Sequence, residues 1–160
     1  MEINGLLDII QTQSYDSLIL THQSLRVLSS AVEAIKQRLA YPMLNVGAVL
    51  SKELIHVHTG QRGGVAQDLL ERMIQTSESG TVLCYGIDLL FEPSLHIDPL
   101  MVFRRASRIR RIIFFWPGSF QESTLAYAET GHNHYRTWRI TADWQSPPNL
   151  QIYPLATPSN

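Results

Sequence analysis

Short apolar runs alternate with stretches of helical periodicity along the first 116 residues, and they predict strands followed by helices. SLILT, residues 17–21, is a short apolar run typical of a buried strand. The stretch after it carries apolar residues at intervals of three and four, which predicts an amphipathic helix: Leu25, Leu28, Val32, Ile35 and Leu39. We expect Ser24 to cap this helix and Pro42 to end it.

The alternation continues beyond Pro42. It predicts further helices around 3–13, 48–56, 65–74 and 99–108, and further strands at 43–46, 81–85 and 111–116. HTGQRGG, residues 58–64, carries three glycines and is expected to be a flexible loop. Strands that alternate with helices indicate a mainly parallel sheet with helices on both faces, which is a three-layer α/β fold.

The pattern changes after Pro117 and Gly118. The runs LAYAE (125–129) and YRTWRI (135–140) predict a β-hairpin or meander added to the sheet. The last sixteen residues hold four of the eight prolines. We therefore expect one α/β domain over residues 1–145 and a proline-rich C-terminal tail over residues 146–160.

The strand and helix at 17–39 stand where a nucleotide-binding α/β protein carries its phosphate loop. A working loop, G-x-x-x-x-G-K-[ST], needs glycines whose backbone N–H groups converge on phosphate, and a lysine for the β- and γ-phosphates. With the loop started at His22, Val27 replaces the second glycine, Leu28 replaces the lysine, and Ser29 supplies the hydroxyl. Moving the register by one residue does not supply a lysine either. We therefore expect a strand–turn–helix unit in which Ser29 is vestigial.

A second nucleotide signal lies after the strand TVLCY (81–85). In an ATPase, an acidic residue at the end of such a strand holds Mg²⁺ and orients water. Here the strand ends in Tyr85, with Asp88 three residues later and Glu92 beyond it. These two acids are either Mg²⁺ ligands or solvated loop residues, and we expect the latter. ATP and Mg²⁺ are thus disfavoured as cofactors, and no cofactor is expected.

Four stretches form a moderately specific set: YPMLNVGAVLSKEL (41–54), IDLLFEPSLHIDPL (87–100), IIFFWPGSF (112–120) and LAYAETGHNHYR (125–136). In this order they resemble the small P-loop protein of BREX phage-defence systems, the BrxF family, over most of residues 17–140. The resemblance implies a compact P-loop NTPase-like fold that acts beside a large ATPase, a phosphatase-fold protein and a DNA methyltransferase. The missing phosphate loop, and Tyr85 in place of an acid, depart from the family. The resemblance therefore implies its fold and setting but not ATP hydrolysis.

The segment FRRASRIRR (103–111) places five arginines within eight residues: Arg104, Arg105, Arg108, Arg110 and Arg111. On a helix, Arg104, Arg108 and Arg111 would share one face. Clustered guanidinium groups suit contact with the phosphates of DNA or with an acidic partner protein. The alternative is a solvated face whose arginines pair with surface acids.

Histidine, cysteine and aromatic residues give weaker signals. The pairs His56/His58 and His132/His134 have the side chains of a Zn²⁺ site, but nothing in the sequence brings the pairs together, so no metal site is expected. Cys84 lies in an apolar strand and is expected to be an inert core thiol. Aromatic residues at alternating strand positions are expected to be core rather than a stacking surface for bases.

Composition narrows the class of protein without identifying it. The 160 residues are 44% hydrophobic and 17% charged, as in a globular domain, and the net charge is −1. That charge gives no overall attraction to nucleic acid or to a membrane. One cysteine, no signal-peptide pattern and no apolar run long enough to span a bilayer favour a cytoplasmic location.

These observations lead to three hypotheses. We favour a non-catalytic accessory or scaffold subunit of a BREX-like bacterial anti-phage system that binds partner proteins, DNA or both through the arginine cluster. The second hypothesis is a divergent ATPase subunit that uses Arg26 or a partner's lysine. The third is a structural protein that assembles into a homo-oligomer. Catalysis is disfavoured because the phosphate-binding lysine is missing.

Overall fold

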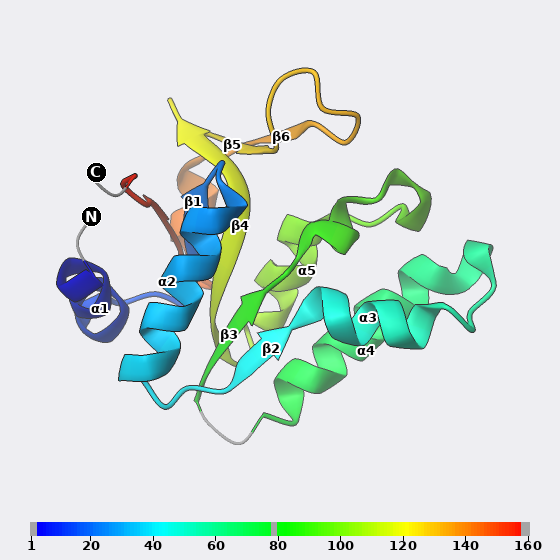
Figure 1. The fold of residues 1–160 in the computed structure, drawn as a ribbon, viewed down its shortest axis with the longest axis horizontal. Coiled ribbons are helices and arrows are strands. Elements are labelled where there is room, and N and C mark those ends of the chain that lie inside the picture. The colour runs from blue at the N-terminus through cyan, green and yellow to red at the C-terminus, as the bar shows by residue number, and fades with distance from the viewer. Residues whose placement is uncertain (1–2, 78–79, 158–160) are drawn as a thin grey trace.

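The computed structural model describes residues 3–77 and 80–157, and its centre is a seven-stranded, mainly parallel sheet (Figure 1). Five strands lie side by side in the order β2-β3-β4-β1-β7, which are Met43–Asn45, Thr81–Tyr85, Arg111–Gln121, Ser17–His22 and Leu150–Pro154. The second half of β4 pairs antiparallel with β5, Thr124–Tyr127, which pairs in turn with β6, Arg136–Arg139. The predicted parallel sheet and its added meander are confirmed.

Helices cover both faces of the sheet (Figure 1). On one face lie α1 and α2, which are Ile3–Thr12 and Leu25–Arg38. On the other lie α3, α4 and α5, which are Val46–Leu54, Arg62–Gln75 and Pro99–Ala106. Strand β4 serves both cores, because Phe115 packs on the α2 side while Phe114 and Trp116 pack on the α5 side. The three-layer α/β class follows, as predicted.

The strand order is P-loop-like. β1 lies in the interior of the sheet and leads directly into α2, and β4 separates β1 from β3. Because β1, β3 and β4 are parallel, their carboxyl ends meet at one edge of the sheet. Open parallel sheets bind their ligands at this edge. We call it the carboxyl edge, and the opposite one the amino edge.

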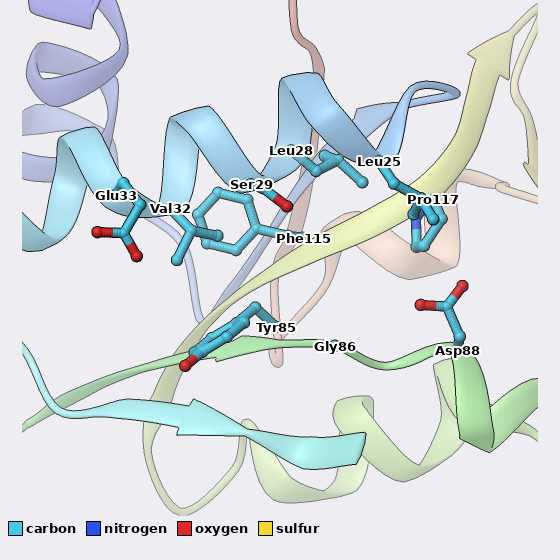
Figure 2. Close-up of a pocket in the computed structure, with 10 residues that line it drawn as sticks. All are labelled: Leu25, Leu28, Ser29, Val32, Glu33, Tyr85, Gly86, Asp88, Phe115 and Pro117. Carbon is cyan, nitrogen blue, oxygen red and sulfur yellow. The ribbon is translucent and has the colours of Figure 1, made fainter. Parts of the chain in front are cut away.

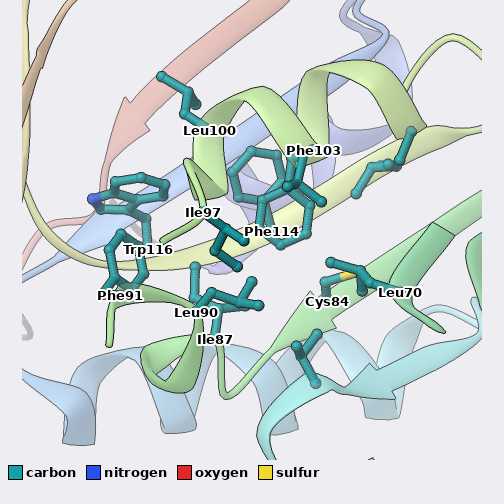
Figure 3. Packing of buried hydrophobic residues seen from close by; sticks show 14 of the residues in the cluster. Leu70, Cys84, Ile87, Leu90, Phe91, Ile97, Leu100, Phe103, Phe114 and Trp116 are labelled. Atoms are coloured by element: carbon teal, nitrogen blue, oxygen red, sulfur yellow. The ribbon is translucent and has the colours of Figure 1, made fainter. Parts of the chain in front are cut away.

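Aromatic rings fill the core between the sheet and α5 (Figure 3). The Phe91 and Tyr127 rings are stacked with centroids 3.7 Å apart, and Trp116 is fully buried. The indole N–H of Trp116 donates to the carbonyl oxygen of Ala126 at 2.9 Å. Cys84 lies in the same core, and burial raises the pKa of its thiol to about 12. The expectation of a core position is confirmed for Cys84, Trp116 and Tyr127, whereas Tyr135 is 41% exposed.

The prediction of a flexible loop over residues 58–64 is wrong from residue 62 onward. Residues 59–61 form one 3-10 turn, and α4 begins at Arg62. A Cβ on Gly63 would lie 2.0 Å from the carbonyl oxygen of Leu95, so only glycine allows α4 to approach the segment before α5. Gly63 therefore serves close packing rather than flexibility.

The expected C-terminal tail also differs from the structure. Residues 150–154 form β7, which pairs in parallel with β1 from Leu150 opposite Ser17. The backbone N–H of Asn149 donates to the Asp16 carboxylate and fixes the start of the strand. β7 lies at the edge of the sheet, where a proline such as Pro154 is tolerated. The single domain thus extends beyond residue 145.

Candidate functional site

A cleft opens at the carboxyl edge between α2 and the chain that follows β3 (Figure 2). Its volume is about 270 Å³. The first turns of α2 form one wall, Tyr85 and Gly86 form the other, and Phe115 and Pro117 of β4 lie between them. It is lined by Leu25, Leu28, Ser29, Val32, Glu33, Tyr85, Gly86, Asp88, Phe115 and Pro117.

A second hollow of about 520 Å³ adjoins the first, with which it shares Leu25, Asp88 and Pro117. Its far side is the segment 127–132, which begins at the last residue of β5. We call the two hollows together the carboxyl-edge cleft. It lies where a P-loop protein would hold its nucleotide.

The start of α2 leaves no room for a phosphate loop. Only Gln23 and Ser24 separate the end of β1 from the first residue of the helix. The Ser24 backbone N–H donates to Nδ1 of His22 at 2.9 Å, and its hydroxyl accepts from the N–H of Val27 at 3.4 Å. Ser24 is thus the N-cap, as predicted, and its hydroxyl takes one of the N–H groups that would otherwise face an anion.

Ser29 and Asp88 lie on opposite walls of the cleft, and both point into it (Figure 2). Oδ1 of Asp88 accepts a hydrogen bond of 3.1 Å from the hydroxyl of Tyr127. Burial, and then the nearby Asp88 charge, raise the pKa of Tyr127, which keeps the phenol protonated as a donor. The structure therefore brings together the two residues named from the nucleotide motifs.

Two acidic cleft residues were not singled out from the sequence. Glu33 and Glu129 carry no nucleotide motif, and only the packing of α2 and the β5–β6 loop places them in the cleft. Leu25 was expected in the buried stripe of α2, but it is 56% exposed at the rim. The lining holds three carboxylates, Glu33, Asp88 and Glu129, and none of the described lining residues is lysine or arginine. The lining therefore supplies negative charge, and none of these residues is a lysine or arginine that would offset it.

The prediction that Arg104, Arg108 and Arg111 share one helix face is wrong. α5 ends at Ala106, and Arg111 is already the first residue of β4. The Ser107 hydroxyl donates to the carbonyl oxygen of Arg104 at 2.7 Å, and residues 107–110 turn the chain into the strand. Arg104, Arg108 and Arg111 thus lie on a helix, a turn and a strand.

Most of these arginines bind other parts of the chain. Arg111 donates to the carbonyl oxygens of Ile10 and Gln13 at 2.9 and 3.0 Å, and its guanidinium lies 3.7 Å from the centroid of the Tyr15 ring. The remaining contacts join Arg104 to the Asp143 carbonyl and the Trp144 ring, Arg105 to Glu71, and Arg110 to the Gln75 carbonyl. Only Arg105 and Arg108 of the five are exposed.

One histidine pair has a further potential metal ligand nearby, because Nε2 of His134 lies 3.8 Å from the Glu92 carboxylate. Nδ1 of His58 accepts from the N–H of Gly60 at 3.3 Å, and the His132 and His134 rings are 5.6 Å apart. Across residues 3–77 and 80–157, no three His, Cys, Asp or Glu side chains form a group that could hold a metal ion. The expectation of no metal site stays a prediction.

No protein-family model and no curated protein matches the sequence. A solved structure of the replication initiator DnaA bound to AMPPCP and single-stranded DNA is similar to this chain, with a TM-score of 0.42 and 12% sequence identity. The similarity covers 94% of this chain and 44% of that chain, so this protein spans less than half the length of its structural neighbour. Within the described residues, no helix is both long and apolar enough to cross a membrane.

Proposed function

We propose that this protein is a non-catalytic binding subunit with a P-loop-like fold, and that it serves a BREX-like anti-phage system in the bacterial cytoplasm. The observation that supports the proposal most strongly is the start of α2. The helix begins at Leu25, and the side chain of Ser24 caps it where a nucleotide protein has its glycine-rich loop.

The physical argument concerns charge. A bound triphosphate requires a converging set of N–H donors and a positive side chain, because its negative charges must be offset once water is displaced. The lining instead presents Glu33, Asp88 and Glu129. Three negative charges next to a triphosphate would repel it, and the exposed Leu25 side chain offers it no hydrogen bond.

The proposed partner surface is smaller than the full arginine cluster. Arg105 and Arg108 are the two exposed members, and they lie at the amino edge beside the exposed Ile109. A partner protein or DNA that docks here would contact these residues, while Arg104, Arg110 and Arg111 continue to hold the fold. We propose BREX-like partners because of the sequence resemblance.

A calorimetric titration tests the absence of nucleotide binding. We expect no saturable heat when Mg-ATP is added to the folded protein at concentrations that detect a dissociation constant of about 100 μM. Phage protection then tests the role as a subunit. In a host that carries the complete system but lacks this gene, Ser29→Ala should restore protection, and Arg105→Glu with Arg108→Glu should not.

The second candidate is a divergent ATPase subunit, and one observation favours it. Ser29 and Asp88 face the same cleft at the carboxyl edge, as residues with hydroxyl and Mg²⁺ roles would. This candidate predicts Mg²⁺-dependent nucleotide binding that Ser29→Ala or Asp88→Ala weakens. Saturable one-to-one binding by the wild-type protein would replace our proposal with this one.

A further inference from the structure

We propose that copies of this chain associate head to tail, with Arg108 and Ile109 at the amino edge of one copy seated in the carboxyl-edge cleft of the next. The inference deepens the proposed function, on which it rests, because it names a second copy of the chain as a partner. The two surfaces lie at opposite edges of one sheet (Figure 1).

The amino edge carries the arginine cluster, of which Arg105 pairs with Glu71. Arg104, Arg105, Arg108, Arg110 and Arg111 lie within eight residues there. The turn 107–110 projects Arg108 and Ile109, both exposed, and 54% of Ile109 is accessible. Among residues 3–77 and 80–157, no hydrogen bond or ion pair holds the Arg108 side chain. The turn therefore presents one cation and one apolar side chain for contact.

The carboxyl-edge cleft has the complementary properties. Its carboxylates are Glu33, Asp88 and Glu129, and Leu28 and Phe115 give it apolar walls. Leu25 exposes 56% of its surface at the rim. A guanidinium on an aliphatic stem satisfies both properties, because the charged head reaches the carboxylates while the stem covers the apolar wall.

The contact must join two molecules. In β4, the amino edge at Arg111 and the carboxyl edge at Pro117 are six residues apart, which is about 20 Å along a strand. Arg108 precedes the strand, so its side chain does not reach the cleft of its own copy. When two copies bind head to tail, the first copy still has a free cleft and the second still has a free amino edge. Further copies can bind to these free surfaces, so the assembly continues beyond a dimer.

Sedimentation equilibrium over a range of protein concentrations tests the proposal. We expect the weight-average mass to rise beyond that of a dimer, with a dissociation constant on the order of 100 μM, because one turn in one cleft is a small interface. Added salt should weaken the association, since the contact pairs opposite charges.

Charge reversal on each side gives matched variants. Arg108→Glu and Glu33→Arg change exposed side chains and are each expected to weaken the association by at least about tenfold. The double variant pairs the exchanged charges and should recover to within about threefold of the wild type. Lys52→Glu alters the net charge as Arg108→Glu does, but on α3 and outside both surfaces, and should leave the association unchanged.

Three results would overturn the inference: a wild-type protein that stays monomeric up to about 1 mM, an assembly that stops at a dimer, or equal effects of Arg108→Glu and Lys52→Glu. A cleft that serves a different protein gives the first of these results. Nucleotide binding in the calorimeter would instead overturn the proposed function, so the two failures are distinguishable.

Discussion

The two edges of the sheet use their polar side chains in opposite ways. At the amino edge, Arg104, Arg110 and Arg111 are bound to backbone carbonyl groups of distant segments. At the carboxyl edge, Ser29 and Asp88 face an open cleft. Three of the five arginines that form the densest functional pattern in the sequence thus hold the fold together, whereas Ser29 and Asp88 lie in the candidate site.

The difference has a physical cause. The last carbonyl groups of a helix have no partner within it and carry partial negative charge. Arg111 donates to carbonyl groups at the end of α1, and Arg110 donates to that of Gln75 at the end of α4. Guanidinium groups are suited to this task, because they carry several donors and a permanent charge. A run of arginines therefore does not by itself indicate a binding surface.

The largest expected effect concerns Arg111. Arg111→Ala removes two charge-assisted hydrogen bonds and the contact with the Tyr15 ring, and should lower the free energy of unfolding by about 3 kcal/mol. Arg108→Ala, the matched control, should change it by less than about 0.5 kcal/mol. Urea denaturation measures both. Equal losses for the two variants would remove the distinction between structural and exposed arginines.

Alkaline pH should lower the free energy of unfolding, because a buried tyrosine near each edge of the sheet has a raised pKa. Burial raises the pKa of Tyr15 to about 12 from 10.0, although the neighbouring Arg111 opposes the rise, and at the other edge burial and then Asp88 raise that of Tyr127. Above pH 10 the unfolded chain releases phenolic protons that the folded protein retains, so the free energy of unfolding must fall as pH rises.

For Tyr15 alone this loss amounts to about 2 kcal/mol by pH 12. Unfolding measured from about pH 9 to about pH 12 should show a smaller decline for Tyr15→Phe and for Tyr127→Phe than for the wild type. In the folded protein, ultraviolet absorbance should show Tyr127 ionising at higher pH than Tyr15, because an anion adjoins the first and a cation the second. The reverse order would contradict the assigned neighbours.

Substitution of Asp88 should have a moderate effect on the free energy of unfolding, because this cleft residue also accepts a hydrogen bond from Tyr127. Asp88→Ala leaves the buried Tyr127 hydroxyl without its acceptor, and should cost about 1–2 kcal/mol of unfolding free energy. In Tyr127→Phe, the same change at Asp88 should cost less than half as much, because no donor is left unpaired. Chemical denaturation of the four proteins completes this cycle, and additive losses would show that the hydrogen bond contributes nothing.

The smallest expected effect is that of Ser29→Ala. Ser29 is exposed on α2, and alanine favours helices, so the free energy of unfolding should change by less than about 0.5 kcal/mol. Isothermal titration with Mg-ATP should give the same flat trace for this variant as for the wild type. A nucleotide signal that the substitution abolishes would return Ser29 to a functional role.

Local patterns were sufficient for most of the secondary structure. Short apolar runs placed β1, β3 and the first half of β4, and a period near 3.6 placed α2, because the strands are buried on both faces and the helix on one. They were insufficient at 58–64 and 150–154. There Gly63 meets the backbone at Leu95, and β7 is completed by pairing with β1, and both contacts join residues distant in sequence.

By itself the sequence determined the α/β alternation, the capped start of α2 and the lack of a phosphate-binding lysine, since these depend on neighbouring residues only. Tertiary structure alone decided which polar groups remain available. It placed Arg111 against the end of α1, and it brought Ser29 and Asp88, 59 positions apart in the chain, to one cleft. Exposure and long-range contacts arise from the packing of whole elements, and no short stretch of residues contains that information.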